Sequence, residues 1–352
     1  MAAHEPAPTD PAEGAVPAGS GVLSGGPQQS LGRALLWMAL ALASFSSIAI
    51  AGRTVTSLMA AEAGREAATY GDTFQLMFYR SIVALVVMAI VISVSRQGWR
   101  QVRSQRLGLH AARNAVHFMG QFSWFHALTL IPLAQLFAIE FTAPIWVALL
   151  APLLLSERMS WLRAAAICVG FTGVLIIVQP GIAPFSLGHA LALSAAINFA
   201  LSMIATRKLM ATDTVVAFLF HMAWMQLPIA AVLAAPFLVL PNGETAVWLL
   251  ILGAAALIAH FALAKAFAAA EAIVVAPMDF LRLPLIALIG ALAYGEEVTI
   301  AVAVGGAVVL SANVLNLLAE RQAHRHRSAG PQPEPPSGPE TSIDKRRSTP
   351  AE

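Results

Sequence analysis

The chain has 352 residues, of which 58% are hydrophobic and only 11% are charged, and its formal net charge is +2. A mean hydropathy of +0.73 excludes an ordinary soluble domain, because such domains are about 45–50% apolar and about 25% charged. We therefore expect an integral membrane protein whose partners are the lipid bilayer and a small molecule, with no nucleic-acid partner. The single cysteine, Cys168, excludes an internal disulfide and a cysteine-based metal site, and no cofactor is predicted.

The two terminal segments differ in composition from the rest of the chain. Residues 1–30 are rich in proline, alanine and glycine, and residues 321–352 contain a run of prolines and a short basic stretch. Neither segment has enough apolar side chain to pack, so both are predicted to be disordered tails. Residues 1–30 also lack the basic start and compact apolar core of a signal peptide, so the first apolar segment is expected to act as the insertion signal.

Ten apolar segments of membrane-spanning length follow one another between these tails. A helix of about 20 residues crosses a hydrocarbon core of about 30 Å. A barrel is excluded, because its strands would be about half as long and would alternate in polarity. We predict an all-α integral membrane protein with ten transmembrane helices, at residues 34–52, 75–94, 107–129, 132–155, 161–178, 187–206, 215–239, 246–267, 272–293 and 298–318.

Basic residues are concentrated in alternate junctions between these segments. The junction after the second segment contains four arginines and no acid, whereas the opposite junctions contain two arginines that nearby acids offset. Because basic loops resist translocation, both termini are predicted to be cytoplasmic in a multi-pass protein of the inner membrane. The basic residues on the predicted cytoplasmic side are Arg96, Arg100, Arg103, Arg106, Arg158, Arg163, Arg207, Lys208, Arg321, Arg325 and Arg327.

The two halves of the chain contain an internal repeat. Pro144 precedes Glu157 by the same spacing as Pro284 precedes Glu297, within similar apolar stretches. The match pairs the first five segments with the last five, and because five is odd the second unit must enter the membrane upside down. Such inverted repeats are typical of secondary transporters, whose substrate site lies near the midplane between the halves. The predicted repeats are residues 34–178 and 187–318.

Several local patterns, taken with this topology, resemble a known family. Arg80 follows Phe78-Tyr79 in the second segment, Ala127-Leu128 leads to Ile131-Pro132-Leu133-Ala134, and the proline-to-glutamate spacing is repeated. Together these features resemble the EamA-type transporters of the drug/metabolite transporter superfamily. The resemblance covers about residues 34–318.

This resemblance carries expectations about fold and function. It implies a helical bundle around a central cavity, alternating access, and a substrate among amino acids, nucleotide-like metabolites, vitamins, polyamines or drugs. The stretch from Arg113 to Trp124 also resembles members of the superfamily that take up S-adenosylmethionine, a shared pattern that does not identify the substrate.

Charged residues deep within the predicted segments are candidates for a substrate site, because a charge in hydrocarbon is costly and should face a polar interior. Glu140 and Asp279 each lie just ahead of a mid-segment proline, Pro144 or Pro284. A proline removes a backbone donor and kinks a helix, which frees carbonyls that need a partner. Asp279 and Arg282 are three residues apart, so on a helix they share a face and lie within pairing reach.

Purely structural roles are an equal alternative for some of these residues. The Asp279–Arg282 pair could only pin one helix to its neighbours, and Arg113 could be the fixed partner of Glu140. Arg80 and Lys265 lie near predicted segment ends, where long basic side chains reach the membrane interface.

The third segment contains a polar stripe. His110, Arg113, Asn114, His117 and Gln121 recur at intervals of three and four residues, which places them on one face of a helix. One such residue is explained by polar packing in a core, but five favour a water-filled path. We expect His117 and Gln121 to lie deep enough to contact substrate.

These patterns predict a secondary transporter that moves a small organic metabolite by alternating access. No Gly-x-x-x-x-Gly-Lys loop is present, so transport would use proton coupling or exchange, with Glu140 and Asp279 as candidate proton carriers. The alternative is a membrane-embedded enzyme acting on a lipid-linked substrate, which the short loops disfavour. A homodimer is left open, and no catalytic residue or metal site is predicted. The predicted substrate-binding residues are Arg113, His117, Gln121, Glu140, Asp279 and Arg282.

Overall fold

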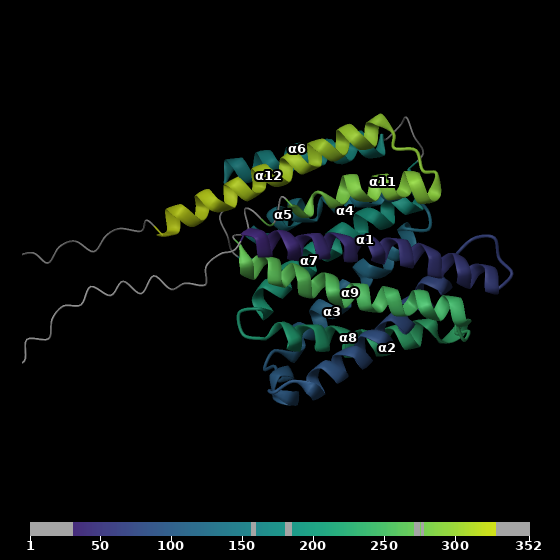
Figure 1. Ribbon diagram of the computed structural model, residues 1–352. Coiled ribbons are helices and arrows are strands. Elements are labelled where there is room, and N and C mark those ends of the chain that lie inside the picture. The colour runs from purple at the N-terminus through teal and green to yellow at the C-terminus, as the bar shows by residue number, and fades with distance from the viewer. Residues whose placement is uncertain (1–30, 156–159, 180–184, 271–274, 276–277, 329–352) are drawn as a thin grey trace, which may run out of the picture.

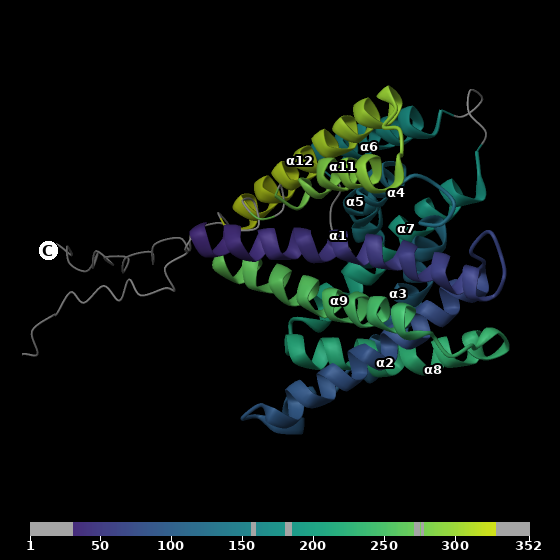
Figure 2. The same cartoon turned by 45° about the vertical axis from the view of Figure 1, so that its right-hand side comes forward.

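The computed structural model describes residues 31–155, 160–179, 185–270, 275 and 278–328, and the described residues form helices and no strands (Figures 1 and 2). The tail predicted at residues 1–30, and the part of the tail predicted at residues 321–352 that follows residue 328, lie outside this part of the chain. The elements are α1 (Leu31–Glu62), α2 (Tyr70–Val94), η1 (Gly98–Val102), α3 (Leu107–Ala127), α4 (Leu133–Glu140), α5 (Ala143–Leu155), α6 (Trp161–Val178), α7 (Leu187–Leu209), α8 (Val215–Ala234), η2 (Ala235–Phe237), α9 (Gly243–Ala269), α11 (Arg282–Tyr294) and α12 (Ile300–Ser328).

The helices have the length and the surface of a multi-pass membrane protein. Eight helical segments in the described chain are long and apolar enough to cross a membrane, with α4 and α5 together forming one of them. Large apolar side chains such as Leu36 and Leu153 are more than 70% exposed, which suits contact with lipid rather than water. The third predicted segment forms the full helix α3, but its polar stripe makes it less apolar than the eight. The ninth predicted segment is described as a helix only in its last part, which forms the 13-residue helix α11.

Helix α2 begins earlier than the sequence predicts. A capping box formed by Thr69 and Asp72 starts the helix at Tyr70 rather than at residue 75. Arg65 supports this start, because its Nη1 and Nη2 atoms lie 2.6 and 2.5 Å from the two Asp72 carboxylate oxygens. The polar first turn therefore belongs to the helix, and Arg80 lies in its third turn rather than near its end.

The two mid-segment prolines lie at helix starts. Pro144 is the second residue of α5 and Pro284 is the third residue of α11, positions where a missing backbone N–H costs no helical hydrogen bond. The predicted kink in the fourth segment is thus a break between α4 and α5. The freed carbonyl of Phe141 accepts a hydrogen bond of 2.7 Å from Asn313 Nδ2 on α12.

Helices far apart in sequence pack in pairs. The main pairs are α1 with α9, α3 with α7, α2 with α8 and α6 with α12, and α4 packs on α11. In both views α6 and α12 form one flank of the bundle, and α2 and α8 form the opposite flank (Figures 1 and 2). The α6–α12 contact depends on glycine, because a Cβ on Gly173 would lie 2.9 Å from the Gly305 carbonyl oxygen.

The first and last described residues lie at the same end of the bundle, which we name the Leu31 end (Figure 1). Basic loops meet there, since Arg106 Nη1 donates a hydrogen bond of 3.0 Å to the Lys208 carbonyl. The opposite end, named the Glu62 end, carries the α1–α2 and α8–α9 connections, where Val239 N–H donates to Gln75 Oε1. Helix α12 continues to Ser328, past residue 318 where the last segment was predicted to end, so the beginning of the predicted C-terminal tail is helical.

The short helix α4 is the most enclosed element. Its side chains Leu133, Leu136, Phe137 and Ile139 are at most 1% exposed. They are surrounded by α6, α7, α11 and α12. The end of α4 therefore places the carboxylate of Glu140 inside the bundle.

Candidate functional site

Two clusters of polar side chains lie inside the bundle. The arginine–amide cluster comprises Arg80 on α2, four residues of the α3 stripe, and Gln226 on α8. The carboxylate cluster comprises Trp124 at the end of α3, Glu140 at the end of α4, Asp279 three residues before α11, and Arg282 at the start of α11. The four stripe residues are Arg113, Asn114, His117 and Gln121.

The stripe predicted on the third segment is buried along its whole length. Its five residues, His110 included, are each less than 9% exposed. Gln226 Nε2 lies 3.0 Å from His117 Nδ1 and 3.4 Å from Asn114 Oδ1, so α8 contributes an amide that the sequence analysis did not single out. The sequence signal that could have identified Gln226 is a single glutamine within an otherwise apolar helix.

Arg80 joins this cluster instead of reaching the membrane interface. Its side chain is buried, and its Nη2 atom donates to Gln121 Oε1 at 2.9 Å and to Gln226 Oε1 at 3.4 Å. The Nε atom is buried and has no hydrogen-bond partner within the described ranges. The interface interpretation of Arg80 is therefore wrong, whereas Lys265 is exposed as that interpretation requires.

Arg113 is held by neutral groups. Its Nη1 atom donates to Asn114 Oδ1 at 2.9 Å, its Nε donates to Thr206 Oγ1 at 3.3 Å, and its guanidinium lies 4.4 Å from the Phe218 ring centroid. Within the described chain neither Arg113 nor Arg80 forms an ion pair with a carboxylate. The pairing of Arg113 with Glu140 is therefore wrong, and two buried cations are compensated only by amide, hydroxyl and aromatic groups.

The carboxylate cluster contains two acids and one arginine. Arg282 Nη2 lies 3.2 Å from Asp279 Oδ2 and 3.5 Å from Glu140 Oε1, so the predicted Asp279–Arg282 pair is confirmed. Trp124 Nε1 donates to Glu140 Oε2 at 2.7 Å. Asp279 Oδ1 is buried without a partner in the described chain. Phe45 and Phe141 flank the Arg282 guanidinium, with ring centroids 4.6 and 5.0 Å away.

The structure thus divides the six predicted residues into two groups of three. Arg113, His117 and Gln121 belong to the arginine–amide cluster, and the other three belong to the carboxylate cluster. His260 on α9 lies beside the second group, with its Nδ1 atom 2.8 Å from the Ala256 carbonyl oxygen of its own helix. Its ring also contacts Phe45, which packs on Arg282, at a centroid distance of 5.7 Å.

The first stripe residue, His110, has a different environment at the Leu31 end. Its Nε2 atom lies 2.6 Å from Asp213 Oδ2 in the α7–α8 connection. Burial alone would raise the pKa of Asp213, but hydrogen bonds from Ser104, His110 and Thr212 outweigh this effect and lower the pKa. This pair ties the start of α3 to the α7–α8 connection.

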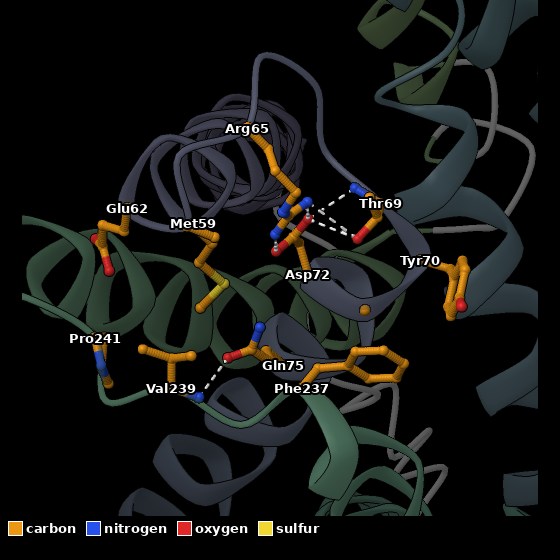
Figure 3. Close-up of a pocket in the computed structure, with 12 residues that line it drawn as sticks. Met59, Glu62, Arg65, Thr69, Tyr70, Asp72, Gln75, Phe237, Val239 and Pro241 are labelled. Carbon is orange, nitrogen blue, oxygen red and sulfur yellow. Dashed lines mark hydrogen bonds and ion pairs between the residues drawn. The ribbon is translucent and has the colours of Figure 1, made fainter.

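A pocket opens at the Glu62 end (Figure 3). It encloses about 350 Å³ between the ends of α1 and α2 and the α8–α9 connection, and the Arg65–Asp72 pair forms part of its wall. None of the six predicted residues lines it. The lining residues are Met59, Glu62, Ala63, Arg65, Thr69, Tyr70, Gly71, Asp72, Gln75, Phe237, Val239 and Pro241.

Buried charges in the interior of a multi-pass helical bundle are characteristic of a path for a polar solute, and they define the class of membrane transporters. Comparison with known proteins gives the particular family. Residues 32–179 match the EamA-like transporter family, and the chain belongs to this family. It is therefore a transporter, and the enzyme alternative is wrong.

Its relatives include transporters for two different solutes. A riboflavin transporter of Vibrio cholerae is 35% identical over 60% of this chain and 74% of its own length. A riboflavin transporter of Rhizobium johnstonii is 30% identical over 82% and 92% of the two chains. An S-adenosylmethionine uptake transporter of Rickettsia felis is 25% identical over 71% and 85%. A crystal structure that is 18% identical shares the fold, with a TM-score of 0.55 over 84% of this chain and 99% of that chain.

Proposed function

We propose that this protein is a secondary transporter of a neutral or anionic heteroaromatic metabolite of the riboflavin type, working by alternating access in the inner membrane with both termini cytoplasmic. The observation that carries the proposal is the pair of buried arginines, Arg80 and Arg113, that lack a carboxylate partner in the described chain. A solute with electron-rich oxygens would complete their hydrogen bonding.

The pairing of the helices supports two inverted repeats of five spans, residues 34–178 and 187–318. Exchanging the first five spans with the last five replaces α1 by α7, α2 by α8, α3 by α9, α4 by α11 and α6 by α12, and the reverse. The exchange converts the α1–α9 pair into the α7–α3 pair, and both pairs are present. The pairs α2–α8, α4–α11 and α6–α12 are each exchanged with themselves. A twofold relation in the membrane plane produces this pattern, and in such transporters the substrate site lies between the repeats.

The chemistry of the arginine–amide cluster favours a riboflavin-type solute over S-adenosylmethionine. Riboflavin has a flat ring with carbonyl oxygens and a ring N–H, which match guanidinium donors and the amides of Gln121 and Gln226. S-adenosylmethionine carries a sulfonium cation, which Arg80 and Arg113 would repel in a low-dielectric interior. Both kinds of solute occur among the relatives, so the charge of the cluster is the deciding feature.

The carboxylate cluster is the proposed coupling site. Two acids share Arg282, so the ionised cluster carries one negative charge in excess, and a proton would neutralise it. Asp279 is the proposed carrier, because its Oδ1 atom has no hydrogen-bond partner among the described residues, whereas Trp124 and Arg282 bind the two oxygens of Glu140. Proton binding at Asp279 would change the pairing of Arg282 and could thereby couple the pH gradient to movement of α4 and α11.

Uptake of radiolabelled riboflavin and S-adenosylmethionine by cells that express the chain tests the proposal. We expect riboflavin to accumulate and S-adenosylmethionine not to. Arg113→Gln should reduce riboflavin uptake about tenfold or more, because a charge-assisted hydrogen bond is lost. The matched control is Arg100→Gln, at an exposed arginine of η1, which should transport normally.

Transport of S-adenosylmethionine in place of riboflavin would overturn the proposed substrate class. Normal riboflavin uptake by Arg113→Gln would overturn the role of the arginine–amide cluster while leaving the transport activity in place.

A further inference from the structure

An ion pair at the Glu62 end, between Arg53 on α1 and Glu296 after α11, is not used by the two clusters. Arg53 also donates to two backbone carbonyls, that of Leu128 at 3.0 and 2.8 Å and that of Ile131 at 2.9 Å. Leu128 lies directly after α3, so the guanidinium binds where the helix dipole and the unpaired carbonyls favour a cation.

Glu296 binds the start of α4 with its second carboxylate oxygen. The Leu133 N–H donates to Glu296 Oε2 at 2.8 Å, which satisfies one of the free donors at this helix N-terminus. Two glycines allow the arrangement. Gly295 ends α11 in the left-handed conformation with φ 64°, and a Cβ on Gly290 would lie only 2.5 Å from Glu296 Oε2.

These contacts tie together the helix pair that carries the carboxylate cluster. Helix α4 runs from Leu133 to Glu140, and α11, which packs on it, runs from Arg282 to Tyr294. Glu296 joins the two at the Glu62 end, and the Arg282–Glu140 contact joins them in the interior. Arg53 then connects this α4–α11 unit to α1 and to the end of α3.

We propose that the Arg53–Glu296 pair is the gate of the solute path at the Glu62 end. Arg53 and Glu296 act as positioning residues that hold the α4–α11 unit against α1 and α3, and the path opens to this end when the pair separates. The gate joins the two proposed repeats, because Arg53 and Leu133 belong to the first and Glu296 to the second. The inference rests on alternating access as proposed above.

A cysteine-accessibility experiment tests the gate without measuring transport. The background is Cys168→Ser, since Cys168 is the only native cysteine. The reporter is Met225→Cys on α8, beside the arginine–amide cluster, where the Met225 sulfur lies 3.5 Å from Asn114 Nδ2. Vesicles of both orientations are treated with a membrane-impermeant thiol reagent. Glu296→Gln should raise the labelling rate about tenfold from the Glu62 side alone, because a charged pair is lost.

The neighbouring residue provides the control. Glu297 is exposed and forms no ion pair or side-chain hydrogen bond with the described residues, so Glu297→Gln should label at the parent rate. Gly290→Ala is a second variant that keeps both charges, and it should act like Glu296→Gln because the added methyl group displaces the carboxylate. Faster labelling from both sides would indicate a loosened bundle and would overturn the gate.

Failure of the proposed gate and failure of alternating access give different labelling results. If Glu296→Gln and Gly290→Ala label at the rate of Glu297→Gln from the Glu62 side, the gate is overturned while alternating access stands. If the reporter in the parent background labels from only one side, even during turnover with riboflavin, alternating access fails and the gate fails with it.

Discussion

Glu140 and Asp279 share Arg282, but their hydrogen bonds differ, and this difference separates a structural acid from a coupling acid. Glu140 accepts from Trp124 at 2.7 Å and from Arg282, whereas one oxygen of Asp279 has no partner in the part of the chain that the structure describes. Glu140→Gln should therefore lower the apparent Tm in detergent, because loss of a hydrogen-bonded buried charge costs about 1–3 kcal/mol. Asp279→Asn should lower the apparent Tm less than Glu140→Gln does, because the side-chain oxygen of Asn can still accept from Arg282 and only the charge of the Asp279–Arg282 pair is lost.

Transport should separate the same two variants. Asp279→Asn should retain riboflavin exchange but lose the response of net uptake to an imposed pH gradient, because the proposed proton carrier is gone. Vesicle uptake with and without a proton ionophore measures this response. An unmodified protein that ignores the gradient, or an Asp279→Asn variant that still follows it, would remove Asp279 from coupling.

Asp213 allows a prediction about pH. Hydrogen bonds lower its pKa in the folded protein, so its ionised form stabilises the fold above the unfolded pKa of about 3.9, and the contribution is lost as the pH falls through the lower folded value. Asp213→Asn should therefore lower the apparent Tm at pH 7 and at pH 5, and the difference should shrink only below about pH 4. A difference that disappears between pH 7 and pH 5, above the range in which Asp213 titrates, would contradict the stabilising role of the ionised Asp213 carboxylate.

The partner of a residue could be predicted from the sequence only where the two residues lie close together in the chain. The Asp279–Arg282 pair follows from helical spacing, and the burial of the α3 stripe follows from its periodicity. The contact between Glu140 and Arg282 joins positions 142 residues apart, so no local pattern contains it. The position of Arg80 was predicted wrongly for another reason. The first turn of α2 is polar, so the helix was predicted to begin too late, and a buried arginine was assigned to the helix end.

At the level of elements, the glycine contact between α6 and α12 allows a prediction about stability. Gly173 on α6 and Gly305 on α12 let the two backbones meet, and a side chain on Gly173 would also strike Val309. Gly173→Leu should lower the apparent Tm, with a cost of about 1–3 kcal/mol typical of overpacking. The matched control is Gly108→Leu in α3, where a Cβ would meet nothing within 4 Å, and it should leave the apparent Tm unchanged or higher.

The continuity of the helices was harder to predict than their positions. The segment at residues 132–155 was expected to be one kinked helix and is two helices, because Pro144 starts α5 and Asn313 satisfies the freed Phe141 carbonyl. Asn313 comes from α12, so the stability of the break depends on a residue that a local reading of residues 132–155 does not include.

At the level of the whole molecule, the sequence predicts an order of helices but not their neighbours. Hydropathy and the positions of basic residues predict that successive spans cross the membrane in opposite directions. Both described chain ends lie at the Leu31 end of the bundle (Figure 1). Which helices pair depends on contacts between the halves, such as α1 with α9 and α3 with α7. That pairing is the best support for inverted repeats, and it can be tested through the positions of equivalent loops.

The connection between the first two spans of each proposed repeat provides this test. Ala67 lies between α1 and α2, and Ala211 lies between α7 and α8, and both are exposed. If the repeats are inverted, these equivalent loops lie on opposite faces of the membrane. In the Cys168→Ser background, Ala67→Cys should react with an impermeant thiol reagent only in right-side-out vesicles, and Ala211→Cys only in inverted vesicles. Labelling of both from one face would mean parallel repeats, and an alternating-access path based on inverted symmetry would then have to be abandoned.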